Sequence, residues 1–339
     1  LLWLKIFLYM SERRIQLYHI HTDLAIESKE LYSGKDVEVE GVSVTTEEMN
    51  NYSVTRVKVN NEHGAQSIRK SIGNYITIDV PNLNNTDEDL KDEISKVLAK
   101  EIKGFGLNNP HSKVLIIGLG NWNITPDALG PKVVDRVLVT RQFFVNYKKD
   151  SDDDLANVAA MAPGVMGITG IESFDIIKGV VDKIKPDLLI AVDALASRKM
   201  DRVSTTIQLS DTGISPGGGV GNKRLALNRN TLGIPVLAIG IPTVVNAATI
   251  VNDTLDLIIS EMKNTAEKGK EFYNMLEELS SEDKYSLIEE ILNPYMKNTI
   301  VTPKDIDDVI DDLSIIIANG LNIALHPGID IKDVNRYIR

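Results

Sequence analysis

The sequence predicts an α/β fold: a mostly parallel open sheet with helices on both faces, extra strands and C-terminal helices. Three continuous apolar runs each end at a glycine or an aspartate and are followed by a loop. Strands that are buried on both faces of a parallel sheet have this pattern, because helices cover both sides. The runs cover residues 114–117, 188–192 and 236–239.

The remaining elements follow from local periodicity. Alternating apolar residues and short apolar runs predict further strands at residues 54–59, 75–80, 158–161 and 203–209. Helical spacing predicts helices at residues 86–102, 133–144, 168–184, 196–202 and 247–262. Pro131 is expected at the first position of its helix, with Asp127 in the loop ahead. Thr302 and Pro303 predict the start of another helix, as N-cap and first residue.

Composition excludes several classes of function. The chain of 339 residues is 43% hydrophobic and contains no cysteine, so thiol nucleophiles, disulfides and Cys-ligated metals are excluded. Its five histidines lack the spacing of a metal site, so we expect no metal and no cofactor. A net charge of −11 disfavours nucleic acid as a partner. The apolar run at residues 1–9 is shorter than the roughly 20 residues that span a bilayer, so we expect no membrane segment. We expect Met10 to be the true start of the chain.

Three loops follow the apolar strands, where parallel sheets bind ligands. The loop at 118–131 resembles a dinucleotide motif but has Asn123 where the third glycine belongs. The loop at 213–223 lacks the lysine of a phosphate-binding loop, although its glycines could form a nest for an anion or an oxyanion. In the loop at 193–198, Ser197 has no histidine nearby in sequence, which disfavours a serine triad.

Asp127 and Asp193 then remain as candidates for chemistry, because both follow buried strands and should emerge at the same edge of the sheet. Two facing carboxylates cannot both ionise easily, so one would act as an acid and the other as a base around a water molecule. Either residue could instead cap a helix or brace a loop. Sequence spacing does not decide between these roles.

At these loops the sequence resembles the germination protease family of endospore-forming bacteria. The segments that carry the resemblance are GLGNWNITPDALGPKVV, MAPGVMGITGIES, IKPDLLIAVDALASRK and GISPGGGVGNKR. The resemblance implies an aspartic-type endopeptidase that degrades small acid-soluble spore proteins at germination. It matches the functional aspartates to Asp127 and Asp193, and it implies a zymogen, a homotetramer, and a cytoplasmic location in the forespore and spore core.

The family is similar to hydrogenase maturation peptidases, which hold a metal with a histidine; no histidine falls near the three loops here. Candidates for substrate or oxyanion contacts are Asn121, Asn123, Ser197, Arg198, Gly218 and Gly219. Two alternatives stay open: a metal-dependent maturation-type peptidase, and a non-catalytic binder of spore proteins or nucleotides.

The segment Thr22–Glu27 resembles the site that the family cuts in its substrates. We therefore expect cleavage between Asp23 and Leu24, in a stretch that looks exposed. The expected domains are residues 1–23, an N-terminal extension and propeptide, and residues 24–339, a single α/β peptidase domain with inserted and C-terminal helical elements.

Overall fold

The computed structural model describes residues 22–33, 38–81, 83, 87–106, 112–147, 154–216, 225–265, 288 and 299–337. The chain forms two compact units. The larger unit comprises residues 22–197, 201–244 and 302–339, and the smaller one residues 1–21, 198–200 and 245–301. The expected division at residue 23 stays a prediction.

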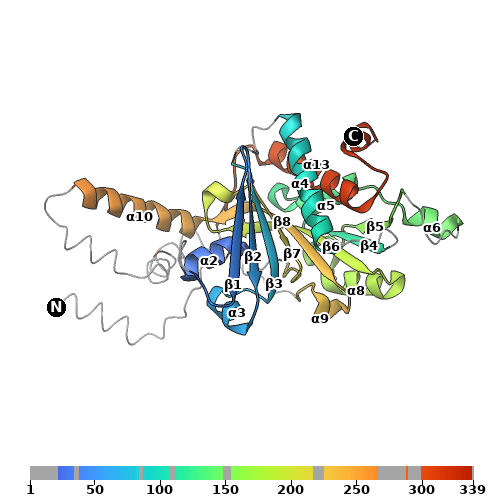
Figure 1. Ribbon diagram of the computed structural model, residues 1–339, viewed down its shortest axis with the longest axis horizontal. Helices are drawn as coiled ribbons and strands as arrows, with labels where there is room; N and C mark the ends of the chain where they lie inside the picture. Colours follow the sequence, from blue (N-terminus) through green and yellow to red (C-terminus); the bar gives the residue numbers. More distant parts are fainter. Residues whose placement is uncertain are drawn as a thin grey trace. The chain divides into compact units, whose positions relative to one another are not determined.

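An open sheet forms the centre of the larger unit (Figure 1). Its strand order is β1-β2-β3-β7-β8-β6-β4-β5. Within the smaller unit, the last two residues of β8, Val245 and Asn246, pair antiparallel with β9. The strands are β1 (Val42–Glu48), β2 (Ser53–Val59), β3 (Gly73–Asp79), β4 (Lys113–Gly118), β5 (Asn157–Met161), β6 (Leu188–Ser197), β7 (Thr206–Ser210), β8 (Val236–Asn246) and β9 (Ile300–Val301).

The three predicted apolar runs form β4, β6 and β8, and the α/β class with an open sheet is confirmed. β4 pairs in parallel with both β5 and β6. Of the other predicted strands, 158–161 forms the parallel strand β5, whereas 54–59, 75–80 and 203–209 correspond to β2, β3 and β7. These three belong to an antiparallel series that runs from β1 through β2, β3 and β7 to β8. The parallel ladder therefore covers the β6-β4-β5 side, and this is the side that carries the loop at 118–131.

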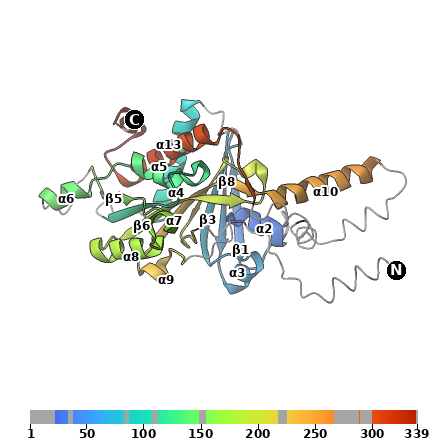
Figure 2. The same ribbon diagram turned by 180° about the vertical axis from the view of Figure 1, so that it is seen from behind.

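Helices cover both faces of the sheet (Figures 1 and 2). On one face, α4, α5 and α13 pack together against a core that includes Ile116 and Ile190. On the other face, α8 packs against Leu115 and Leu189. The helices are α2 (Ala25–Ser33), α3 (Glu62–Ile68), α4 (Glu88–Gly104), α5 (Leu129–Arg136), α6 (Arg141–Tyr147), α7 (Met166–Thr169), α8 (Ser173–Ile184), α9 (Arg229–Leu232), α10 (Ala247–Thr265), α13 (Ile306–Leu325) and α14 (Ile331–Tyr337).

The helix predicted at 133–144 is wrong in its bounds, because the structure has two helices there, α5 and α6. Between them Thr140 leaves helical geometry, and its N–H donates to the carbonyl of Val158 in β5 at 2.9 Å. The start of the helix also differs from the prediction: α5 begins at Leu129, so Pro131 is its third residue and not its first. The helix predicted from residue 168 also divides, since Gly170 ends α7 in a left-handed conformation with φ of 72°.

Two further helix predictions are wrong. Residues 196–202 hold the end of β6 and a short 3-10 turn, η3 (Met200–Arg202), because β6 continues to Ser197. Thr302 does not cap a helix; its hydroxyl donates to the carbonyl of Thr243 at 2.8 Å, and α13 begins at Ile306. Residues 10–50 carried no predicted element, yet the structure has α2 and β1 there.

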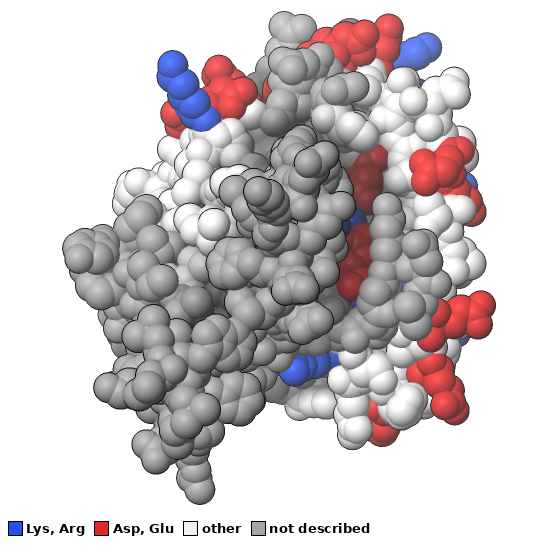
Figure 3. Space-filling view, turned by 90° about the vertical axis from the view of Figure 1, so that its left-hand side faces the viewer, with Lys and Arg blue, Asp and Glu red and all other residues white. Residues whose placement is uncertain are grey.

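Acidic side chains outnumber basic ones in the sequence, and one face of the molecule shows the same excess. On the face in Figure 3, Asp and Glu side chains cover more of the coloured surface than Lys and Arg do, in keeping with the net charge of −11. In the part of the chain that the structure describes, no helix has both the length and the apolar character needed to cross a membrane.

Candidate active site

Main-chain contacts join the ends of β4 and β6. The N–H of Leu119 donates to the carbonyl of Val192 at 2.8 Å, which extends the parallel pairing of Gly118 with Val192 by one residue. Gly130, in the first turn of α5, fits against both ends. A Cβ at Gly130 would lie 2.3 Å from the carbonyl oxygen of Leu119 and 2.6 Å from that of Val192. Only glycine permits this approach, so α5 lies directly on the two strand ends.

Asp127 is held in the turn between β4 and α5. It ends the 3-10 turn η2 (Thr125–Asp127), and its N–H donates to the carbonyl of Ile124 at 2.8 Å. Its own carbonyl accepts from the N–H of Asn121 at 2.9 Å. Gly120 has φ of 116°, and a Cβ there would lie 1.9 Å from the Asp127 carbonyl oxygen. The turn therefore closes on Gly120, which fixes the half-buried Asp127 beside the end of β4.

Asp193 lies on the neighbouring strand, and it is only 5% exposed. The sequence placed it just beyond a strand, but β6 continues to Ser197, so Asp193 lies within β6. The strand continues because residues 194–197 are themselves largely buried. One carboxylate oxygen of Asp193 accepts from the N–H of Ala194 at 2.9 Å, which offsets part of the cost of burying the charge.

The two aspartates come from adjacent segments at the carboxyl edge of the parallel strands. The η2 turn contacts β6, and Val192, which anchors the loop, is the residue before Asp193. The hydroxyl of Thr125 in η2 also donates to Asp307 on α13 at 2.8 Å. These contacts brace the turn that carries Asp127 between β6, which carries Asp193, and α13.

The second candidate region is the predicted cleavage segment. The N–H of Asp23 donates to the carbonyl of Ala196 on β6 at 3.2 Å, and the N–H of Ala196 donates to the Asp23 carboxylate at 2.9 Å. Leu24 and Ala25 are fully buried, so the expected exposure of this stretch is wrong. The reason is that α2 begins at Ala25, which packs against β2, β3 and α3.

Comparison with known proteins decides the family. The germination protease family matches residues 20–269 and 260–338. The germination protease of Clostridium tetani is 48% identical over 320 residues, covering 94% of this chain and 99% of that protein. That of Clostridium perfringens strain 13 is 50% identical over 327 residues, covering 95% and 100%. The chain belongs to the germination protease family.

More distant germination proteases also match along the whole length. The relative from Oceanobacillus iheyensis is 42% identical over 369 residues, covering 97% of this chain and all of that protein. The NiFe hydrogenase maturation protease HycI from Thermococcus kodakarensis aligns to 39% of this chain with a TM-score of 0.25 and 20% identity. Membership of the germination protease family makes the chain a peptidase, and so a hydrolase.

The other predicted contact residues do not all gather at the aspartates of this germination protease. Asn121 braces the loop, since its side-chain oxygen accepts from the N–H of Asn123 at 3.0 Å, and Asn123 itself is exposed. Ser197 is buried at the end of β6. Arg198 belongs to the smaller unit and pairs with Asp253 on α10 at 3.0 Å. Gly218 and Gly219 lie outside the described residues.

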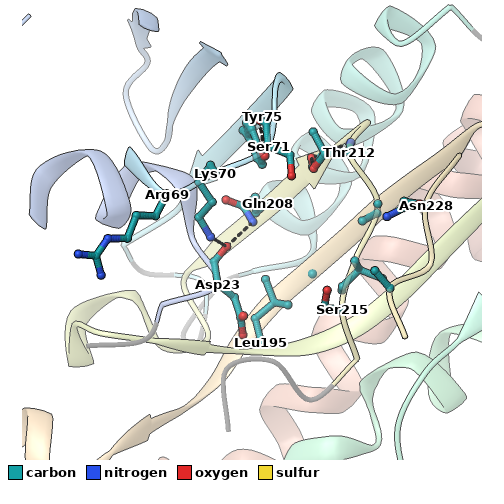
Figure 4. A pocket seen from close by; sticks show the side chains of 16 residues that line it. Asp23, Arg69, Lys70, Ser71, Tyr75, Leu195, Gln208, Thr212, Ser215 and Asn228 are labelled. Carbon is teal, nitrogen blue, oxygen red and sulfur yellow. Dashed lines mark hydrogen bonds between the residues drawn. The ribbon is translucent and has the colours of Figure 1, made fainter. Parts of the chain in front are cut away.

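Sequence reasoning missed Lys70 and Gln208, which contact the cleavage segment. They lie with Asp23 along a pocket of about 250 Å³ (Figure 4). Neither residue belongs to a motif: Lys70 directly follows the C-cap of α3, and Gln208 lies in β7, so no local signal marks them. Among the described residues, no three His, Asp or Glu side chains converge as a metal site would require.

Proposed function

We propose that this germination protease is an aspartic-type endopeptidase that cleaves small acid-soluble spore proteins. The observation that carries the proposal is the position of Asp127 and Asp193 on two adjacent, mutually braced segments, with Asp193 almost fully buried. Peptide hydrolysis without cysteine or a serine triad needs an acid and a base that act on water, and a carboxylate pair supplies both.

In this mechanism one carboxylate is ionised and the other keeps its proton, because two close negative charges repel each other. The ionised carboxylate takes a proton from water while the oxygen of that water attacks the peptide carbonyl. The protonated carboxyl group then donates its proton to the leaving nitrogen as the carbon–nitrogen bond breaks. The two aspartates thus exchange roles, and the titration belongs to the pair as a whole.

The proposal extends to processing, assembly and location. The chain is made as a zymogen and cuts itself between Asp23 and Leu24, in the segment that resembles a substrate. It acts as a homotetramer in the cytoplasm of the forespore and in the spore core. Its acidic surface and its resemblance to germination proteases support a protein substrate without nucleic acid as a direct partner.

The test is Asp127→Asn and Asp193→Asn, each assayed on a purified small acid-soluble spore protein. Asn keeps the shape of the side chain but cannot exchange a proton, so each variant should lose about 10²–10⁴-fold in kcat. The matched control is Asp175→Asn, an exposed residue in the first turn of α8, which should keep full activity. Thermal unfolding checks that every variant is folded.

The same preparations decide the alternatives. N-terminal sequencing of aged wild-type protein should find a new terminus at Leu24 that is absent in Asp193→Asn. Activity within a few-fold of wild type in either aspartate variant contradicts the aspartate pair. Activity lost in a chelator and restored by a metal would instead identify a metal-dependent peptidase, and binding of the spore protein without any turnover a non-catalytic binder.

A further inference from the structure

Asp23 occupies a defined position on β6. Its main-chain N–H and its side-chain carboxylate bind the carbonyl and the N–H of the same residue, Ala196. A carboxylate therefore takes the place that a main-chain carbonyl would have in a β-ladder. Ala196 is three residues beyond Asp193, or about 10 Å along the strand. The Asp23–Leu24 bond is thus held away from Asp193.

Two side chains hold the carbonyl of that bond. Lys70 Nζ donates to the Asp23 carbonyl at 2.9 Å and to the Thr22 carbonyl at 3.1 Å. The Gln208 side-chain N–H donates to the Asp23 carbonyl at 3.1 Å, while its oxygen accepts from the N–H of Ala25 at 2.6 Å. Figure 4 shows both side chains directed at Asp23. Lys70 and Gln208 therefore bind main-chain groups on both sides of the predicted cleavage point: the carbonyls of Thr22 and Asp23 before it and the N–H of Ala25 after it.

Local structure positions these donors. Arg69 ends α3 in the left-handed conformation with φ of 53°, which turns the chain, and the N–H of Lys70 returns to the Ala65 carbonyl at 3.1 Å. Gln208 is almost buried and lies in β7 between β3 and β8. The end of α3 thus positions Lys70, and β7 positions Gln208.

The positive charge of Lys70 is better matched by a carboxylate than by the main-chain carbonyls that it contacts in the uncut chain. Burial lowers the pKa of Lys70, and the negative charges of Asp23 and Glu27 oppose that shift. In the uncut chain its ammonium group donates to two uncharged carbonyl oxygens. A hydrogen bond from an ammonium to a carboxylate is about twice as strong as one between neutral groups.

Cleavage would create such a carboxylate in place. Water adds across the bond, so that Asp23 gains an α-carboxylate and Leu24 gains an α-amino group. Leu24 and Ala25 are fully buried at the start of α2 and stay with the chain. A ligand in the position of Asp23 must consequently end there, because α2 occupies the space beyond.

We infer that Lys70, Gln208 and the main chain of Ala196 form a binding site for a peptide that ends in an acidic residue with a free α-carboxylate. The inference deepens the proposed function and rests on its self-processing step. Two ligands share this chemistry: the released N-terminal segment, and the acyl-side product of a substrate cut after an acidic residue. Either ligand occupies the edge of β6 next to the pocket, and the site retains product after cleavage.

The test uses processed enzyme and synthetic peptides, with affinity measured by calorimetry. A peptide with the sequence of residues 17–23 represents the released segment, and an unrelated peptide ending in Thr-Glu represents a substrate product. Each should bind at least tenfold more tightly with a free C-terminal carboxylate than as the amide. Lys70→Met should remove that difference, while Lys70→Arg and the control Lys58→Met, an exposed lysine on β2, should keep it.

Tight binding of only one peptide identifies which source the site accepts. Equal affinity of carboxylate and amide forms, or an unchanged preference in Lys70→Met, overturns the inference. A chain that never acquires Leu24 as its terminus contradicts the processing step separately. In that uncut chain Asp23→Ala removes the carboxylate that accepts from the N–H of Ala196, so amide hydrogen exchange at Ala196 should become at least tenfold faster. Unchanged exchange at Ala196 would refute the site.

Discussion

Gly130 has no side chain, and this allows α5 to approach the ends of β4 and β6 closely. Gly130→Ala would place a Cβ within 2.6 Å of three main-chain atoms of Leu119 and Val192, so α5 and the adjoining η2 turn must shift. We expect about 1–3 kcal/mol loss in the free energy of unfolding from overpacking. We also expect kcat to fall about 100-fold, since a displacement near 1 Å is enough for that.

The matched control is Gly179→Ala, in α8, where a Cβ would have no neighbour within 4 Å. It should raise the free energy of unfolding by about 0.4–1 kcal/mol and leave kcat unchanged. Chemical denaturation and steady-state assays measure both quantities. Equal activity in the two glycine variants would show that the close contact at Gly130 does not position the aspartates.

At the scale of elements, the sequence predicts a strand or helix correctly where the pattern of its own residues determines it. The continuous apolar runs of β4, β6 and β8 require burial on both faces, and this requirement is visible in the sequence. The predicted bounds of a helix are wrong where a residue distant in sequence takes a hydrogen bond that the helix would otherwise make. The carbonyl of Val158 accepts from the N–H of Thr140 in this way. The contact of Asp23 with Ala196, Lys70 and Gln208 was not predictable, because it joins four segments that are distant in sequence.

The end of α13 gives an element-scale prediction about pH. His326 is buried; its Nδ1 accepts from the N–H of Ala156 at 3.2 Å, and its Nε2 is 3.1 Å from the Leu138 carbonyl oxygen. Burial lowers the pKa of His326 below 6.5, and the bond to Leu138 opposes this shift. The unfolded chain therefore takes up the proton first. Stability that is present above pH 6.5 is lost as the pH falls through that value towards the folded-state pKa.

His326→Gln removes this titration, so Tm should vary less between pH 7 and pH 5 than it does in wild type. At pH 7 the variant should lose about 1–3 kcal/mol in the free energy of unfolding, because buried partners are left unpaired. Thermal unfolding across the pH series measures both effects. A pH dependence of Tm identical to that of wild type would show that His326 does not link folding to protonation.

At the scale of the whole molecule, the proposed tetramer must cover apolar surface that one chain leaves exposed. On α6, which contacts the edge strand β5, the side chains of Phe143, Val145 and Tyr147 are 48%, 55% and 76% exposed. Exposed large apolar side chains that are concentrated on one short element are typical of contacts between subunits. Sedimentation equilibrium should therefore give the mass of four chains.

The double variant Val145→Glu, Tyr147→Glu should give a smaller species, since two buried charges oppose association. Met49→Glu, at a position after β1 that is 50% exposed, is the control and should remain tetrameric. A wild-type mass of one chain contradicts the tetramer, whereas an intact tetramer in the double variant excludes α6 from its contacts.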